Sequence, residues 1–281
     1  MSALISVEQL TKLEYVQILE VGEKTADPVT AKQALALYKQ GHIGHAKYVD
    51  LTEHFSKQTG NLQYQCPSLD EFKQSFESFG LSWDKPIVIY DRANHIWAAR
   101  LWWVLSAYGH PQCYVLHGEW QAWETQKIRH IAWLKPSLQH TQSVLPDDLQ
   151  LNTNMFASLS DVAKVCQGKT DVHLINVLRK PVFEGSELRY HRAGHIPNSI
   201  NIPFSHFLTE QGQFKTIDSE FLQQHFLELS NEIIIYCGSG VTASGAALAL
   251  LEAGASNLKI YDGSMEEWSA NKSLPLTLIA Q

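Results

Sequence analysis

Residues 233–243 read Ile233-Ile234-Ile235-Tyr236-Cys237-Gly238-Ser239-Gly240-Val241-Thr242-Ala243. The β-branched run before Cys237 is typical of a strand that is buried on both faces. The small and apolar residues after Thr242 predict a helix. A cysteine between a strand and a helix N-terminus lies where backbone N–H groups and the helix dipole lower the pKa of a thiol. Two glycines let the loop amides turn toward an anion at the sulfur, so the stretch predicts a nucleophilic thiolate in an anion-binding loop.

The chain carries this pattern twice. A strand-like run at residues 87–90 also precedes an apolar helix-like run, and Tyr90 matches Tyr236. Upstream, residues 41–43 and 194–196 both read Gly-His-Ile. The period of roughly 150 residues is far too long for a solenoid. Strands that alternate with helices predict an α/β fold of two tandem domains, each with a largely parallel sheet and helices on both faces.

The two copies differ at the loop. The position that matches Cys237 holds Asp91 in the first copy, and both glycines are missing there. We expect a first domain without the nucleophile over residues 1–135, a linker rich in Pro, Gln and Asn over residues 136–154, and a catalytic domain over residues 155–281. Inside the first domain, a capping box that starts at Ser68 predicts a helix through Phe79.

Composition limits the function classes. The chain has 281 residues, 44% of them hydrophobic, and a formal net charge of -7. This acidic balance, without a cluster of Lys and Arg, argues against a nucleic-acid partner. No signal-like N-terminus and no apolar run of membrane-span length is present, so we expect no membrane association and a cytoplasmic location. The four cysteines form no CxxC pair, and we expect no metal and no cofactor.

Two other chemistries use a loop of this kind. Residues 238–243 match a G-x-G-x-x-A nucleotide fingerprint, but only about 20 residues follow Asp262, too few to complete a dinucleotide domain. A cysteine phosphatase would place an arginine six positions after the cysteine to bind phosphate, and that position is Ala243. Both alternatives are therefore disfavoured.

The tandem repeats, the Gly-His-Ile segments and the Cys-Gly-Ser-Gly-Val-Thr-Ala loop together resemble the rhodanese superfamily of two-domain sulfurtransferases. A loop with basic residues is typical of its thiosulfate-using members, whereas Gly238-Ser239-Gly240 is similar to the loop of the 3-mercaptopyruvate sulfurtransferases. The resemblance implies that the Cys237 thiolate takes sulfur from 3-mercaptopyruvate, releases pyruvate, and passes the persulfide sulfur to a thiol, to thioredoxin or to cyanide. Thiosulfate as the donor and a non-catalytic binding module are the alternatives.

The resemblance also implies roles for individual residues. Ser239 would bind the substrate or relay a proton, together with His42 and an acid at Glu20, where the family usually has Asp. One of the family's two carboxylate-binding arginines matches Arg189. The other position holds Val182, with Arg179 three residues earlier as a substitute. The loop residues that would hold the persulfide are Gly238, Gly240, Val241 and Thr242.

Overall fold

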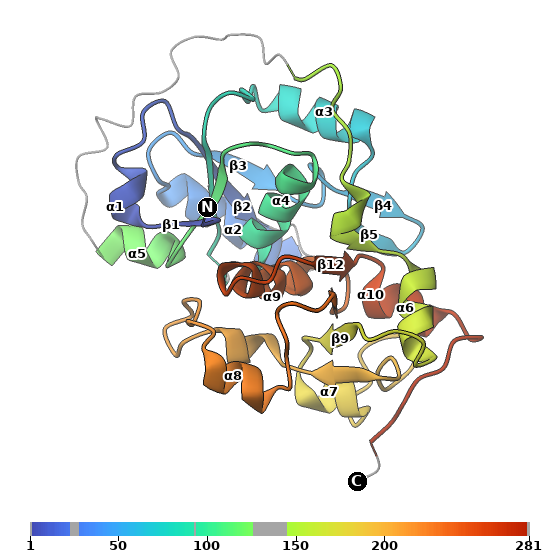
Figure 1. Cartoon of the computed structure of the whole chain (residues 1–281). Helices are drawn as coiled ribbons and strands as arrows, with labels where there is room; N and C mark the ends of the chain where they lie inside the picture. Colours follow the sequence, from blue (N-terminus) through green and yellow to red (C-terminus); the bar gives the residue numbers. More distant parts are fainter. Residues whose placement is uncertain (1, 23–27, 93, 126–144, 280–281) are drawn as a thin grey trace. The chain divides into compact units, whose positions relative to one another are not determined.

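The computed structural model describes residues 2–22, 28–92, 94–125 and 145–279 and contains two compact units (Figure 1). The first comprises Met1–Lys57 and Cys66–Asn152, and the second comprises Gln58–Gln65 and Thr153–Gln281. Of the linker expected from the sequence, residues 136–144 lie outside the described residues.

The first unit is built on a sheet of five parallel strands in the order β1-β7-β6-β2-β3. Helices connect the strands, as expected for parallel pairing. The bounds are β1 (Leu4–Ile5), α1 (Val7–Leu10), β2 (Gln17–Gly22), α2 (Pro28–Gln40), β3 (Lys47–Asp50), α3 (Leu69–Ser78), β6 (Ile87–Tyr90), α4 (Ile96–Ala107), β7 (Cys113–Leu116) and α5 (Glu119–Thr125). The short strands β4 (Lys57–Thr59) and β5 (Leu62–Gln65) pair with each other in a separate sheet, and all but Lys57 of them belongs to the second unit.

The second unit repeats this architecture. Its five parallel strands follow the order β8-β12-β11-β9-β10. The bounds are η2 (Thr153–Met155), β8 (Phe156–Ala157), α6 (Leu159–Cys166), β9 (His173–Asn176), α7 (Lys180–Glu184), β10 (Ser199–Asn201), η3 (Phe204–Phe207), α8 (Ser219–Gln224), β11 (Ile233–Tyr236), α9 (Val241–Glu252), β12 (Leu258–Tyr261) and α10 (Ser264–Ala270). Each strand of the first five-stranded sheet has its counterpart at the same place in this order, which confirms the duplicated α/β fold.

The matching tyrosines at the ends of β6 and β11 show how closely the copies correspond. The Tyr90 hydroxyl accepts a hydrogen bond from the N–H of Ile43 at 3.0 Å, and the Tyr236 hydroxyl accepts one from the N–H of Ile196 at 3.1 Å. Both tyrosines are fully buried. Each Gly-His-Ile segment is therefore tied to the central strand of its sheet, which explains why the motif recurs.

Local capping signals set several helix starts. Ser68 caps α3 through a capping box with Glu71, and the helix ends at a C-cap on Phe79, as the sequence predicts. Equivalent capping boxes open α1 at Ser6 and α6 at Ser158. These boxes satisfy backbone donors at the helix starts that would otherwise lack partners.

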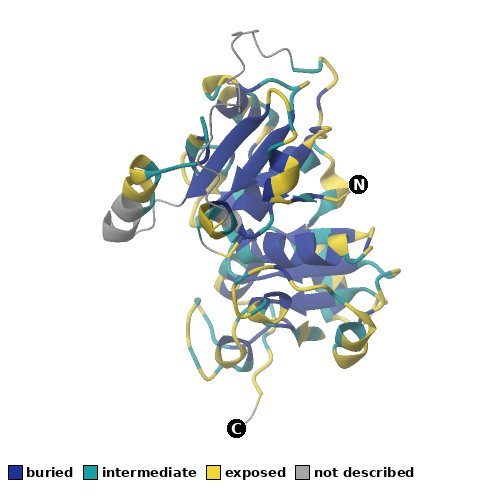
Figure 2. Cartoon of the chain, turned by 90° about the vertical axis from the view of Figure 1, so that its left-hand side faces the viewer, coloured by how far each residue is buried: buried dark blue, intermediate teal, exposed yellow. Residues whose placement is uncertain are grey.

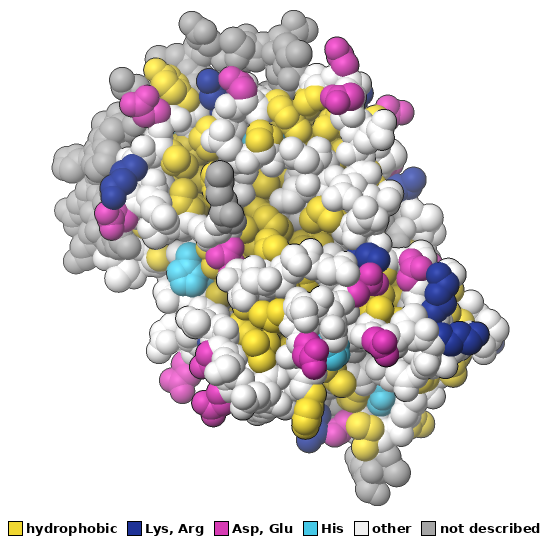
Figure 3. Space-filling model, viewed as in Figure 1, with side chains coloured by type: hydrophobic (Ala, Val, Ile, Leu, Met, Phe, Trp, Pro, Cys, Tyr) yellow, Lys and Arg dark blue, Asp and Glu magenta, His cyan; other side chains and the backbone are white. Residues whose placement is uncertain are grey.

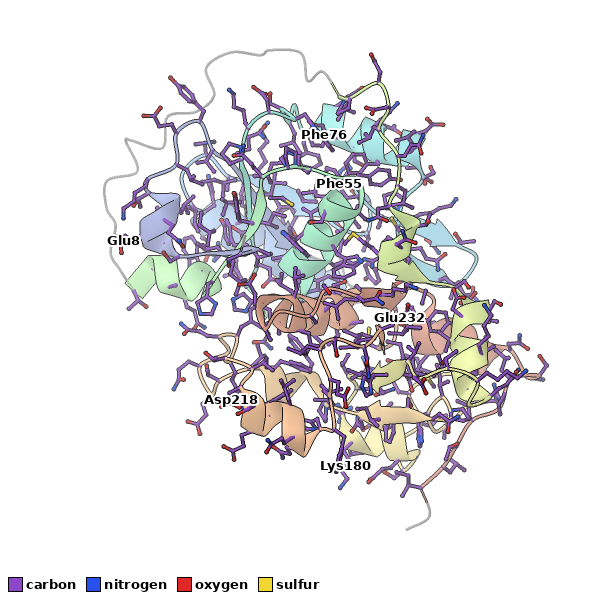
Figure 4. All side chains as sticks on the ribbon, viewed as in Figure 1. Glu8, Phe55, Phe76, Lys180, Asp218 and Glu232 are labelled. Carbon is purple, nitrogen blue, oxygen red and sulfur yellow. The ribbon has the colours of Figure 1, made fainter. Side chains whose placement is uncertain are left out.

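The buried residues gather in the strands, and β6 and β11 are buried along their whole length (Figure 2). Aromatic rings fill the core beside α3, where Phe72 stacks on Tyr108 with centroids 4.0 Å apart; Phe55 and Phe76 of this region are labelled in Figure 4. On the face seen in Figure 3, Lys and Arg lie among Asp and Glu. None of the helices in the described ranges is both long and apolar enough to cross a membrane.

Candidate active site

Cys237 lies between the end of β11 and the start of α9, and it is 2% exposed. Its N–H donates to the hydroxyl oxygen of Ser264 at 3.1 Å, and that hydroxyl donates to the carbonyl of Tyr261 at 2.8 Å. Its carbonyl accepts from the N–H of Met265 at 3.1 Å. The segment between β12 and α10 therefore holds the backbone of Cys237 in place.

The loop ends at Gly240, the N-cap of α9, which has the left-handed φ of 81° that glycine adopts without strain. Within the described part of the chain, no acceptor meets the N–H groups of residues 238–243. The first N–H groups of a helix have no intrahelical partner, and the helix dipole places partial positive charge there. The loop therefore offers several convergent donors to an anion beside Cys237.

In the corresponding loop of the first unit, the N–H groups bind a carboxylate of the chain itself. Asp91, fully buried at the end of β6, accepts N–H hydrogen bonds with its carboxylate from His95 at 3.1 Å, from Trp97 at 2.8 Å and from Ala98 at 2.8 Å. These donors belong to the N-cap and first turn of α4. The first unit thus fills its anion site with its own side chain, whereas the second unit places a thiol there.

Position 238 requires a glycine because a neighbouring side chain leaves no room for a methyl group, and not because the backbone has a conformation that only glycine adopts. A methyl group on its Cα would lie 2.3 Å from the hydroxyl oxygen of Tyr190 and 3.0 Å from the ring carbon that carries it. Its carbonyl accepts from the N–H of Glu266 at 3.1 Å. Tyr190 therefore packs directly on the residue that follows the thiol.

We expect Gly238→Ala to lower the free energy of unfolding by about 1–3 kcal/mol, the usual cost of overpacking a tight contact. Adding Tyr190→Phe should recover part of this loss, because the closest clash is with the hydroxyl oxygen. Denaturant unfolding of the two single variants and the double variant checks the coupling. A double variant that is no more stable than Gly238→Ala alone would contradict the contact.

Of the predicted substrate-binding arginines, Arg189 directly precedes Tyr190, which packs on Gly238, whereas Arg179 is engaged on the surface. Arg189 is exposed; burial raises the pKa of Tyr190, and the positive charge of Arg189 acts in the opposite direction. Arg179 pairs with Glu187 at 2.6 Å on the surface, with its side chain 62% exposed. Val182 is buried within α7.

Ser239 occupies the middle of the loop, between the two glycines, and is half-buried. No described residue hydrogen-bonds its hydroxyl, so this group is available to a ligand in the loop. The substrate or proton-relay role of Ser239 stays a prediction.

Glu20 and His42, the two residues of the first unit that the resemblance suggests for a proton relay, each have polar contacts within that unit. The buried carboxylate of Glu20 accepts from Arg92 at 2.6 Å and from the hydroxyl of Tyr90. The Arg92 guanidinium also stacks over Trp120, 4.1 Å from the ring centroid. His42 is half-buried; its Nδ1 lies 3.0 Å from the carbonyl oxygen of Tyr38. These contacts anchor both side chains within the first unit, and their part in a proton relay stays a prediction.

Sequence reasoning missed Tyr190 and Ser264. Both lie far from Cys237 in the chain and reach it only through the fold. For Ser264 the signal was its place shortly after β12, a strand that neighbours β11, at the edge where ligands of parallel sheets bind. For Tyr190 no local signal exists.

Comparisons with known proteins identify the family of this chain. The model of the rhodanese-like domain matches residues 8–126 and 166–271. A thiosulfate sulfurtransferase from Gallus gallus is 30% identical over 277 residues, which cover 95% of this chain and 93% of that protein. A 3-mercaptopyruvate sulfurtransferase from Escherichia coli (strain K12) is 30% identical over 245 residues, which cover 85% of this chain and 84% of that protein.

The fold comparison extends over almost the whole chain. The crystal structure of SseA from Escherichia coli, described as a 3-mercaptopyruvate sulfotransferase with a rhodanese fold, superposes with a TM-score of 0.74. The match has 26% identity and covers 94% of this chain and 99% of that one. Both copies of the α/β domain, the single cysteine loop and these relatives lead to one assignment: the chain belongs to the rhodanese-like family.

Proposed function

We propose that this chain transfers sulfur from 3-mercaptopyruvate to a thiol or cyanide acceptor through a persulfide on Cys237 and releases pyruvate. Its class is established: the chain is a sulfurtransferase enzyme. The observation that carries the proposal is the pair of matching loops. The carboxylate of Asp91 accepts hydrogen bonds from the N–H groups at the start of α4, whereas the second unit has a thiol at that position and N–H groups that no acceptor among the described residues meets.

The first half-reaction needs a thiolate. The Sγ of Cys237 attacks the sulfur of 3-mercaptopyruvate, and the bond between that sulfur and C3 breaks. The electron pair moves to C3 and is delocalised over the neighbouring ketone as the enolate of pyruvate, which then takes up a proton. Sulfur remains on Cys237 as a persulfide, and the N–H groups at the start of α9 would hold its negative charge.

The second half-reaction restores the enzyme. A thiolate acceptor, such as a small thiol or thioredoxin, attacks the outer sulfur of the persulfide. The sulfur–sulfur bond breaks, and its electron pair returns to the Sγ of Cys237. Because the buried loop stabilises the thiolate as well as the persulfide, the same donors serve both half-reactions.

The loop favours mercaptopyruvate over thiosulfate as donor. Residues 238–242 carry no charged side chain, so the loop has no cation of its own for the charge of thiosulfate. Arg189, next to the loop through Tyr190, provides one cation for the single carboxylate of mercaptopyruvate. A ratio of kcat/KM values for the two donors tests this choice, and a clear preference for thiosulfate would overturn it.

Replacing Arg189 with Met should lower kcat/KM for mercaptopyruvate by about tenfold, because a hydrogen bond to a charged group contributes roughly 1.5 kcal/mol. Initial rates over a range of mercaptopyruvate concentrations give this value. Lys180→Met is the matched control, since Lys180 lies exposed on α7 beside Glu184 (Figure 4). Equal kcat/KM values for the Arg189 variant and the control would exclude Arg189 as the carboxylate ligand.

A further inference from the structure

Arg192 binds the carboxyl end of α10 with all three nitrogens of its guanidinium group. Its Nε donates to the carbonyl of Ser269 at 2.8 Å, and its Nη1 donates to that of Leu274 at 2.9 Å. Its Nη2 donates to the carbonyls of Asn271 at 2.7 Å and Trp268 at 3.2 Å. The last carbonyls of a helix have no intrahelical partner and attract a positive charge. This half-buried side chain therefore ties its own segment to the end of α10.

The segment that contains this arginine is a loop, residues 186–193, which we call the anchored loop. At its base, a methyl group on Gly185 would come within 3.1 Å of the nitrogen of Gly194, so the two ends of the loop lie in contact. A second bond to α10 comes from the N–H of His191, which donates to the hydroxyl oxygen of Ser269 at 3.2 Å. The later half of the anchored loop is thus fixed to α10.

The same helix supports the Cys237 loop at its other end. In the first turn of α10, the N–H of Met265 donates to the carbonyl of Cys237 at 3.1 Å. The N–H of Glu266 donates to the carbonyl of Gly238, also at 3.1 Å. Tyr190 of the anchored loop packs on Gly238 from outside the helix. One short helix therefore sets the positions of both the nucleophile and the anchored loop.

We propose that Arg192 is a positioning residue for sulfur transfer, because it fixes the anchored loop on α10 and so sets the place of Arg189 relative to Cys237. The inference rests on the proposed function, in which Arg189 binds the carboxylate of mercaptopyruvate. Arg192 takes no part in the chemistry, since its guanidinium is occupied by backbone carbonyls. A displacement of about 1 Å can lower a rate by about 100-fold, so the support of a binding group affects catalysis.

The loss of activity in an Arg192 variant should depend on the presence of Arg189. We expect Arg192→Met to lower kcat/KM for mercaptopyruvate by about tenfold, as Arg189→Met does, because it removes the support of the same contact. The double variant should lose little more than either single variant, since one contact can be lost only once. A residue that only stabilised the fold would lower the melting temperature and, well below it, leave kcat/KM unchanged.

The experiment measures initial rates of pyruvate release by the full chain, well below the melting temperature of each variant. Lys259→Met is the control, because it removes another half-buried cation of the second unit, one that pairs with Glu232 at 2.9 Å. It should keep the wild-type kcat/KM. Arg192→Lys is the second variant if Arg192→Met does not fold; it keeps the charge but has a single nitrogen for the carbonyls, and a loss in the same direction is expected.

Two results would overturn the inference. One is a folded Arg192 variant with the wild-type kcat/KM, and the other is a double variant in which the separate losses of Arg192 and Arg189 multiply. Both are measured against a wild-type enzyme that releases pyruvate from mercaptopyruvate. A wild-type enzyme that releases none would instead overturn the proposed function.

Discussion

Cys237→Ser is expected to abolish sulfur transfer from both mercaptopyruvate and thiosulfate. Removal of a catalytic nucleophile lowers kcat by roughly 10⁶-fold in well-studied hydrolases, and no residual persulfide route remains here. Serine keeps the size and the backbone contacts with Ser264 and Met265. Its hydroxyl stays protonated at neutral pH, however, and an oxygen cannot carry a persulfide. The loss should therefore be chemical and not structural.

Initial rates with both donors measure this loss. The control is Cys166→Ser, which changes a half-buried free cysteine of the same unit at the end of α6 and should keep full activity. Unchanged melting temperatures of both variants would show that the fold is intact. Transfer activity retained by Cys237→Ser would contradict the mechanism, whichever donor supports it.

The second large effect concerns stability. Asp91→Ala is expected to lower the free energy of unfolding of the first unit by about 3 kcal/mol, because three N–H donors lose their buried acceptor at roughly 1 kcal/mol each. Asp91→Asn should cost about half as much, since one oxygen acceptor remains. The change lies in the first unit and removes no group of the Cys237 loop.

Tryptophan fluorescence during denaturant unfolding reports on this unit. Trp268 is the one tryptophan after residue 133, so the other tryptophans all come from the first part of the chain. Asp84→Ala is the control, because its exposed carboxylate pairs with Lys85 on the surface, and such pairs contribute little. If Asp91→Ala unfolds at the same denaturant concentration as the control, the carboxylate does not stabilise the loop as described.

The sequence predicted those parts of the fold that depend on local patterns. The capping box of Ser68 and Glu71 lies within one helical turn, and the buried run of β11 precedes Cys237 directly. The repeated Gly-His-Ile segments indicated the duplication, and the family assignment confirms it. Such signals can be recognised in the sequence because the interacting residues are close together in the chain or because the same segments occur twice in the same order.

Contacts between distant residues were not predictable in the same way. Nothing near Tyr190 in the sequence indicates that its hydroxyl meets Gly238, and the hydrogen bond from Cys237 to Ser264 also depends on strand order. The contacts of Glu20 could not be predicted from the sequence either. Its family position suggested a proton relay, but the sequence did not reveal that β2 and β6 pair Glu20 with Tyr90 and bring Arg92 to its carboxylate.

The proposed mechanism requires sulfur to reside on Cys237 between the two half-reactions. The most direct test is the intact mass of the wild-type chain after treatment with mercaptopyruvate and removal of the excess. We predict a gain of about 32 Da, the mass of one sulfur atom, that disappears on addition of cyanide and never forms in Cys237→Ser. No gain in the wild type, or an equal gain in Cys237→Ser, would contradict the account.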